Sequence, residues 1–428
     1  MATSTSLSDV FPLGSRLNER GRLEVGGCDT IELAREFGTP AYAVAEDDLR
    51  ARARAFLQAG KDAAHEDFHV VFASKAFPCT AVLALLAQEG LWCDVATGGE
   101  LHLALKAGFT PERIVVHGNA KSEGELRMAL RHRVGLIVLD NFDELDRLER
   151  LLAEGVSADR GGQPVLVRVT PGVRGDTHEK ISTGQADSKF GFAMAEAREA
   201  LARVQAVPGL ALAGVHAHIG SQLIELAPFR AAVAQLAELG DFPVWDFGGG
   251  LGVRYASSEP PPPTAEEYVG AIVTAARAHG IGPDRRLLIE PGRAISANAG
   301  VTLYTVESVK RNVSRWVAVD GGMSDNLRPM LYGAVYEAHV ADRFGGAGEY
   351  VLVGKHCESG DVIVDEAMLD DPKPGDVIVT PATGAYGYAM ASNYNGLPRP
   401  PVIFCRDGDA RVVVRRESFE DLTARDVL

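Results

Sequence analysis

Residues 70–77 read Val-Val-Phe-Ala-Ser-Lys-Ala-Phe, a β-branched and aromatic run that ends in a lysine. Such residues are typical of strands, and the following residues 81–89 carry apolar side chains at helical spacing. We therefore expect a strand that ends near Ser74, a loop that carries Lys75, and then a helix. Seven further apolar runs repeat this order as far as residue 293.

The alternation of short apolar runs with amphipathic segments predicts parallel strands joined by helical crossovers. Eight such units favour a (β/α)8 TIM barrel; a doubly wound open sheet is the alternative. The runs are His69–Ser74, Leu91–Ala96, Ile114–Val116, Leu136–Leu139, Val165–Val169, Ala213–His218, Val244–Phe247 and Leu287–Glu290. The helical segments include Ala81–Glu89, Glu100–Ala107, Glu123–Arg131 and Phe229–Leu239.

Unusual residues at the ends of these runs favour the barrel. In a barrel the carboxyl ends of the strands converge on one mouth, where active sites are built, whereas an open sheet would scatter them. These residues are Lys75, Asp94, His117, Asp140, Arg168, His218, Gly248–Gly250 and Glu290.

After Arg293 the pattern changes to short strands separated by turn signals such as Pro374-Gly375 and Asp407-Gly408, which predicts an all-β C-terminal domain. We expect an N-terminal segment (residues 1–40) that packs with the β domain or the barrel rim, a barrel over 41–293 and the β domain over 294–428. The expected strands are Val301–Lys310, Trp316–Asp320, Glu349–Val353, Asp361–Asp365, Asp376–Thr380, Pro401–Cys405 and Arg411–Arg415.

Composition narrows the class of protein. The 428 residues are 46% hydrophobic and 24% charged, which is ordinary for a soluble globular protein. A net charge of −15 argues against a nucleic-acid partner, which calls for a basic face. No apolar stretch approaches the roughly 18 residues that span a bilayer, and no secretory signal is expected. Five scattered cysteines without a CxxC pair indicate a reducing, cytoplasmic location without a structural zinc site.

Lys75 and Glu290 are candidates for chemistry at the barrel mouth. Lysine loses its proton readily when desolvated, which makes it the usual Schiff-base residue for carbonyl substrates and for pyridoxal phosphate (PLP). Glu290 would serve as a general base, a metal ligand or an ion-pair partner; in a PLP site it would pair with the pyridine nitrogen. A structural pair with Arg293 or Arg254 is the alternative.

Three loops after neighbouring strands offer groups that bind anions. The consecutive glycines Gly248–Gly250 let backbone N–H groups approach an anion closely, and the loop after strand seven is a common phosphate site. Gly220-Ser221 and Gly292-Arg293 add an amide, a hydroxyl and a guanidinium. Together the loops predict a phosphorylated ligand, although the glycines alone would also suit a simple turn.

His216 and His218 would face the same side of a strand. His-x-His suits a metal, but no well-spaced cysteine or further histidine completes a site. We therefore expect core or ring-stacking roles, and no metal.

In the β domain, residues 354–360 (Gly-Lys-His-Cys-Glu-Ser-Gly) place reactive groups in one short loop. The Cys357 thiol would donate or accept a proton, and Glu358 would hold an ammonium group. Arg328 matches a carboxylate, and Tyr332 and Tyr386 lie in similar loops. Solvated surface loops are the alternative for all of them.

The chain resembles the fold-type III PLP-dependent decarboxylases, and among them the branch that acts on diaminopimelate. Eight motifs in family order, spread over nearly the whole chain, carry the resemblance. They are Phe-Ala-Ser-Lys-Ala, Cys-Asp-Val-Ala-Thr-Gly-Gly-Glu, His-Gly-Asn-Ala-Lys, Ser-Lys-Phe-Gly, His-Ala-His-Ile-Gly-Ser-Gln, Glu-Pro-Gly-Arg, Asp-Gly-Gly-Met and Cys-Glu-Ser-Gly-Asp.

The resemblance implies a role for each candidate. Lys75 would bind PLP covalently, His218 would stack on its ring, Glu290 would pair with the pyridine nitrogen, and Cys357 would return a proton to Cα after CO₂ leaves. Asp94 would form part of the pocket wall. The phosphate end would be surrounded by Ser221, Gly249, Gly250, Gly292 and Arg293. Substrate would be read by Arg293, Arg328, Tyr332, Glu358 and Tyr386, the last also lying beside the cofactor.

The expected reaction is decarboxylation of meso-2,6-diaminopimelate to L-lysine and CO₂, the last step of lysine biosynthesis, in a head-to-tail homodimer whose Cys357 loop reaches the partner's barrel. Alternatives are a decarboxylase of ornithine, arginine or carboxynorspermidine, a racemase, and a non-catalytic PLP-binding relative. Arg328 favours diaminopimelate because this substrate carries a second carboxylate. Glu358 does so because ornithine decarboxylases typically follow the cysteine with aspartate.

Overall fold

The computed structural model describes residues 7–156, 161–173, 188–346 and 348–427. The chain forms two compact units, which we describe separately. The barrel unit comprises Arg52–Gly252 and Pro262–Ala294, and the β unit comprises Met1–Ala51, Val253–Pro261 and Ile295–Leu428.

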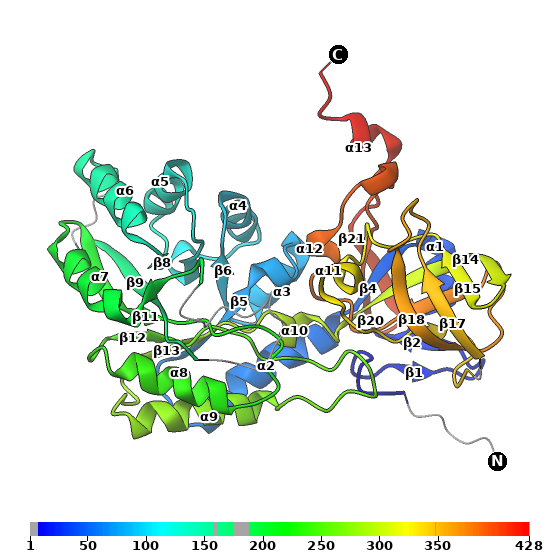
Figure 1. The fold of residues 1–428 in the computed structure, drawn as a ribbon, viewed down its shortest axis with the longest axis horizontal. Coiled ribbons are helices and arrows are strands. Elements are labelled where there is room, and N and C mark those ends of the chain that lie inside the picture. Colours follow the sequence, from blue (N-terminus) through cyan, green and yellow to red (C-terminus); the bar gives the residue numbers. More distant parts are fainter. Residues whose placement is uncertain (1–6, 157–160, 174–187, 347, 428) are drawn as a thin grey trace. The chain divides into compact units, whose positions relative to one another are not determined.

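In the barrel unit eight parallel strands form a closed ring, since β13 pairs with β5 and β8 pairs with β9 (Figure 1). The closed ring confirms the predicted barrel and excludes the open sheet. A short strand, β10 (Phe192–Ala193), which the sequence did not predict, extends β9. The ring strands are β5 (Phe68–Ala73), β6 (Trp92–Val95), β7 (Ile114–Val116), β8 (Leu136–Leu139), β9 (Gln163–Thr170), β11 (Leu210–His216), β12 (Val244–Asp246) and β13 (Arg286–Ile289).

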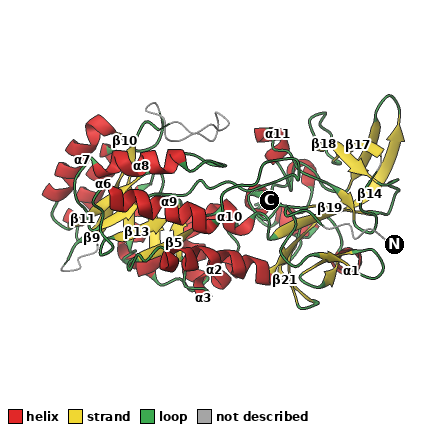
Figure 2. Ribbon diagram, turned by 90° about the horizontal axis from the view of Figure 1, so that it is seen from below, coloured by secondary structure: helices red, strands yellow, loops and turns green. Residues whose placement is uncertain are grey.

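Helices surround the ring, and α8 and α9 pack against each other (Figure 2). Side-chain caps account for several helix starts: the Ser122 hydroxyl accepts a hydrogen bond from the Glu125 N–H while the Glu125 carboxylate accepts one from the Ser122 N–H. Thr264 and Glu267 cap α9 in the same way. The helices are α3 (Thr80–Gln88), α4 (Gly98–Lys106), α5 (Glu123–His132), α6 (Phe142–Ala153), α7 (Met194–Ala206), α8 (Ala227–Ala237) and α9 (Ala265–Ala278). A longer helix, α2 (Glu46–Asp62), precedes β5.

The interior of the ring is filled with apolar side chains from almost every strand. Because apolar side chains fill the interior, polar side chains are accommodated at the carboxyl ends of the strands. The cluster comprises Val71, Trp92, Val115, Leu136, Val138, Leu166, Val244 and Leu288.

The β unit is built on a mostly antiparallel sheet in which an inner strand, β4 (Ala41–Ala45), comes from the N-terminal part of the chain and pairs with β14 and β20. At the predicted Asp407-Gly408 turn both residues are left-handed (φ 51° and 84°), which suits a two-residue hairpin. The other strands are β14 (Gly300–Arg311), β15 (Arg315–Val319), β16 (His339–Val340), β17 (Gly348–Val353), β18 (Val362–Leu369), β19 (Val377–Thr380), β20 (Val402–Arg406) and β21 (Asp409–Val414).

The N-terminal segment contributes to the hydrophobic core of this unit. Strands β1 (Arg16–Leu17), β2 (Leu23–Val25) and β3 (Cys28–Asp29) form a small sheet beside α1 (Thr30–Phe37). Leu23, Val25 and Leu33 from this segment pack with Val301 and Ile403 of the large sheet. The N-terminal segment therefore belongs to the β fold. None of the helices in the described residues is long and apolar enough to cross a membrane.

Candidate active site

Polar side chains from several strands meet at the carboxyl end of the barrel. Lys75 lies in a single 3-10 turn (Ser74–Ala76) directly after β5, Asp94 lies in β6, and His218 follows β11. Burial raises the pKa of Asp94, and the nearby charges of His117 and Lys75 oppose that shift. Burial and then the charge of Lys75 keep the pKa of His218 well below its usual range, so this imidazole is neutral beside the lysine.

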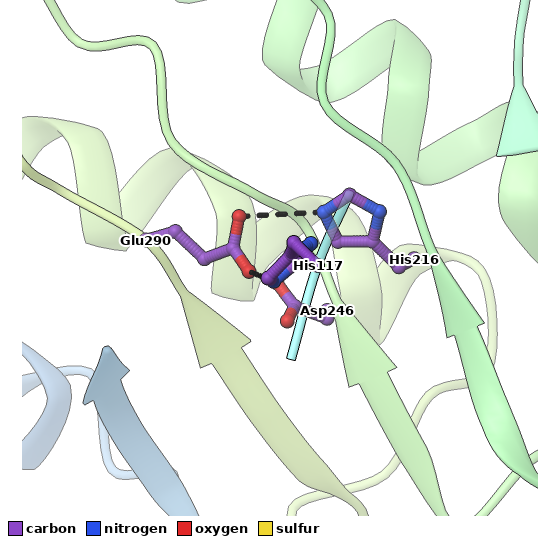
Figure 3. A group of neighbouring side chains, drawn as sticks. All are labelled: His117, His216, Asp246 and Glu290. Atoms are coloured by element: carbon purple, nitrogen blue, oxygen red, sulfur yellow. Dashed lines mark hydrogen bonds and ion pairs between the residues drawn. The ribbon is translucent and has the colours of Figure 1, made fainter. Parts of the chain in front are cut away.

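Glu290 follows β13 and is enclosed by two histidines and an aspartate (Figure 3). His117 Nε2 lies 2.6 Å from Glu290 Oε1, and His216 Nε2 lies 3.3 Å from Oε2. Burial raises the pKa of Glu290, but the two histidines lower it further, so the carboxyl titrates well below its usual range. Glu290 is therefore an ionised carboxylate at neutral pH. Arg254, one of the two arginines named as alternative partners, pairs with Asp9 in the β unit.

The four side chains His117, His216, Asp246 and Glu290 also have the composition of a metal site, since their potential ligand atoms all lie within 4.8 Å of one another. Two ligands on a tetrahedral ion with bonds of about 2.0–2.1 Å would stand roughly 3.3 Å apart. The 2.6 Å between His117 Nε2 and Glu290 Oε1 is the distance of a close ion-pair contact instead, and His216 Nε2 hydrogen-bonds to Oε2. The arrangement is therefore a hydrogen-bonded network.

The three predicted anion-binding loops pack closely in the barrel unit. Arg293 Nη2 donates to Ser221 Oγ over 2.8 Å, and the Gly249 N–H donates to His218 Nδ1 over 3.2 Å. A Cβ on Gly249 would lie 2.1 Å from the Glu290 carbonyl oxygen, and one on Gly250 would lie 2.4 Å from that of Gly220. Only glycine fits at these two positions, so the anion donors stay close to Glu290 and His218.

This donor set fits PLP. A guanidinium and a hydroxyl lie side by side for a phosphate, a neutral imidazole is present for the face of a ring, and a buried carboxylate is present for a ring N–H. Lys75 provides the amine for a carbonyl carbon at the same mouth.

In the β unit, the loop that holds Cys357 and Glu358 is exposed but anchored. The Cys357 N–H donates to Asn395 Oδ1 over 3.0 Å, and the Tyr394 hydroxyl donates to the Glu358 carboxylate. Next to them His356 is buried, with Nδ1 2.8 Å from Asp361. The base of the loop is thus held by a buried contact between His356 and Asp361, while Cys357 and Glu358 themselves are exposed.

The predicted substrate-binding residues Arg328 and Tyr332 begin and end α11 (Arg328–Tyr332). Arg328 is 5% exposed, donates to the Tyr336 hydroxyl, and lies 4.5 Å from the centroid of the Tyr255 ring. The surface alternative is therefore wrong for Arg328. Tyr386, at the start of α12 (Gly387–Met390), is left-handed with φ 66° and interacts electrostatically with Arg328.

Sequence reasoning missed the partners of Glu290. It placed His117 at a strand end and gave His216 a core or stacking role, and it assigned Asp246 no role. Each of the three ends or directly follows a barrel strand, as Glu290 does. That shared position is the sequence feature that could have identified them as partners of Glu290, because side chains at adjacent strand ends meet at the mouth.

Comparisons with known proteins point to one group. The family model for the pyridoxal-dependent decarboxylases, pyridoxal binding domain, matches residues 46–297. The chain is 46% identical to a diaminopimelate decarboxylase of Actinosynnema pretiosum, over 98% of this chain and 95% of that protein. It is 45% identical to the diaminopimelate decarboxylase of Bacillus subtilis, over 96% and 97% of the two chains.

Solved structures agree with these relatives. The diaminopimelate decarboxylase of M. jannaschii in complex with L-lysine superposes with a TM-score of 0.90 at 31% identity, covering 97% of this chain and 98% of that one. The enzyme of Helicobacter pylori complexed with L-lysine gives a TM-score of 0.86 at 32% identity, covering 92% and 98%.

Proposed function

This chain belongs to the pyridoxal-dependent decarboxylases, in the diaminopimelate decarboxylase group, and we propose that it removes CO₂ from the D centre of meso-2,6-diaminopimelate to give L-lysine. Its cofactor is PLP. The observation that carries the proposal is the mouth of the barrel, where Lys75, the Ser221–Arg293 pair and the ionised Glu290 provide the three kinds of group that PLP requires.

The barrel residues bind and orient the cofactor. Lys75 would hold PLP covalently through its carbonyl carbon, His218 would face the ring, and Glu290 would accept a hydrogen bond from the ring N–H. Bound in this way, PLP supplies an electron sink for the carbanion left by loss of CO₂. Asp94 forms the wall beside Lys75. Ser221, Gly249, Gly250, Gly292 and Arg293 would hold the phosphate.

The residues of the β unit handle the substrate. Cys357 donates a proton from Sγ to Cα after CO₂ has left, and Glu358 holds the distal ammonium group. Arg328 binds the distal carboxylate, with Tyr332, Tyr386 and Arg293 as further contacts. This carboxylate is the group that ornithine, arginine and lysine lack, so Arg328 selects diaminopimelate among the basic amino acids.

The active assembly is a head-to-tail homodimer in the cytoplasm, in which the loop with Cys357 and Glu358 reaches the partner subunit's barrel. The exposed thiol and carboxylate of this loop in a single chain are consistent with a role toward a second chain. Sedimentation at micromolar concentration tests the assembly, and a monomer with full activity would contradict it.

The reaction is tested with purified protein supplied with PLP. CO₂ release is measured from meso-diaminopimelate, ornithine, arginine and lysine, together with the visible absorbance of bound cofactor. Turnover of meso-diaminopimelate alone supports the proposal, and turnover of ornithine without diaminopimelate contradicts the assigned substrate.

A further inference from the structure

Each oxygen of the Glu290 carboxylate is contacted by a side chain that no step above uses. Both of its oxygens face an imidazole Nε2, at 2.6 Å for His117 and 3.3 Å for His216, and the two rings meet edge-on with centroids 4.9 Å apart. His216 and Asp246 are fully buried, and His117 is 6% exposed. Polar groups buried to this extent are costly unless they hydrogen-bond to one another.

Asp246 brings a second carboxyl into the same pocket. Its Oδ1 accepts a hydrogen bond from the Gly248 N–H over 2.9 Å. Within the described part of the chain no donor reaches Oδ2, whose hydrogen-bonding neighbour is the Glu290 carboxylate. Two adjacent buried carboxyls do not both ionise, so one of them holds a proton.

The proton resides on Asp246. Glu290 has two imidazole donors that stabilise its charge, whereas Asp246 has a single backbone amide. Burial and then the negative charge of Glu290 hold the pKa of Asp246 well above its usual range. A protonated Asp246 Oδ2 becomes a donor, and its available acceptor is Glu290.

The histidine next to Asp246 in the ring is neutral. Burial lowers the pKa of His216 to about 4. A neutral imidazole carries one N–H, and since Nε2 faces Glu290 the proton is on Nε2. Consistently, His216 Nδ1 has no hydrogen-bond partner among the described residues.

We propose that His117, His216 and Asp246 are positioning residues that hold Glu290 as an oriented carboxylate, with Asp246 acting as a neutral acid that donates its proton to Glu290. This inference rests on the proposed function, in which Glu290 must be ionised to accept the ring N–H. Without these donors the buried Glu290 would take up a proton at higher pH and lose that ability. Other titratable groups interact electrostatically with this site and also face it. They are Asp94, Arg168, His218 and Tyr268, and Lys75 interacts with Asp94.

The test is a pH titration of the visible absorbance of bound PLP in the substrate-free holoenzyme. His117→Leu removes a donor, and the acid-side midpoint should rise by about one to two pH units. His117→Gln is the matched control, because the glutamine amide N–H reaches about as far as the imidazole Nε2. Its midpoint should lie at least halfway back from the His117→Leu value to the wild-type value. A His117→Leu holoenzyme that titrates like the wild type overturns the proposal.

Asp246 provides the sharper comparison. Asp246→Asn keeps an N–H donor in place of the neutral acid, so its midpoint should stay within about 0.3 pH unit of the wild type. Asp246→Leu removes the donor and should raise the midpoint by about one unit or more. Equal shifts in both variants overturn the neutral-acid assignment.

A third readout needs no variant. In ¹⁵N spectra of histidine-labelled apoenzyme at pH 7, His216 should give the signals of the neutral Nε2–H tautomer, and an imidazolium or Nδ1–H signal overturns the proposal. Failure of the proposed function and failure of this inference give different experimental results. Wild-type protein that binds no PLP defeats the proposed function, whereas a normal holoenzyme whose titration ignores these substitutions defeats only this inference.

Discussion

Lys121 Nζ lies 2.8 Å and 2.9 Å from the two carboxylate oxygens of Glu144, and the side chains are only 1% and 0% exposed. The ammonium also donates to the carbonyl oxygens of Gly118 and Val138. Lys121 belongs to the loop after β7, the loop that begins with His117. This buried pair therefore ties the loop of a Glu290 partner to β8 and α6.

Breaking the pair should destabilise the barrel. Lys121→Met leaves Glu144 as a buried unpaired carboxyl, and losses of about 3–5 kcal/mol are typical for such changes. The thermal unfolding midpoint should fall by several degrees. The double variant Lys121→Met, Glu144→Leu should recover most of this loss, and a double variant as unstable as the single one would argue against the pair.

A buried carboxyl in the β unit predicts a pH dependence of stability. Burial raises the pKa of Asp325 to about 7, although hydrogen bonds from Tyr304 and Gly322 oppose the shift. In the unfolded chain the same group titrates near 3.9, so the folded state binds the proton first. This group therefore makes the fold more stable as pH falls from about 7 toward 4, and least stable above 7.

The variant Asp325→Asn tests the predicted direction of this pH dependence, because the amide does not titrate. The stability of the wild type relative to the variant should fall by up to about 4 kcal/mol between pH 4 and pH 8. Urea unfolding at both pH values measures it. Any constant offset from the changed hydrogen bonds does not matter, and a difference that stays the same at both pH values would contradict the shifted pKa.

The proposed role of Cys357 as proton donor predicts that a variant without this thiol is a slow enzyme that still binds its cofactor. Cys357→Ala should reduce kcat by about 10²–10⁴-fold, which is typical for loss of a general acid, while the visible absorbance of PLP stays unchanged. Cys79→Ala, at the start of α3 and buried, is the control and should keep normal turnover. Full activity in the Cys357 variant would remove this residue from the mechanism.

Subunit mixing tests the proposal that two chains share each active site. A Lys75→Ala chain and a Cys357→Ala chain are each impaired, but their heterodimer has one site with both native residues. Random reassociation of equal amounts should restore about a quarter of wild-type activity, since half of the dimers carry one complete site of two. No recovery after proven exchange would mean that Lys75 and Cys357 of one chain act together.

The sequence predicted the β/α order of the barrel because each strand is a continuous apolar run bounded by turns or helices. The strand ends also carried the polar residues of the mouth. Position made Lys75 and Glu290 candidates, and the resemblance to the PLP-dependent decarboxylases supplied the roles predicted for them. The network around Glu290 was not predicted. His117, His216 and Asp246 lie far apart along the chain, and only the closing of the ring and the side-chain rotamers bring their atoms together.

The local environment of the β-unit residues could not be predicted from the sequence either. Arg328 was predicted to bind a carboxylate, yet nothing in the segment around it indicated burial against Tyr255, which lies more than seventy residues earlier in the chain. The hydrogen bond from Tyr394 to Glu358 is another contact between separate loops. Such contacts depend on tertiary packing, and local patterns do not encode them.

The central claim, that Lys75 anchors PLP for decarboxylation of meso-diaminopimelate, is tested most directly by one paired measurement. Wild type, Lys75→Ala and the exposed control Lys61→Ala are each supplied with PLP, and visible absorbance and CO₂ release from meso-diaminopimelate are recorded on the same samples. The account predicts both signals in the wild type and in Lys61→Ala, and neither in Lys75→Ala. A Lys75→Ala protein that retains the absorbance and releases CO₂ would contradict it.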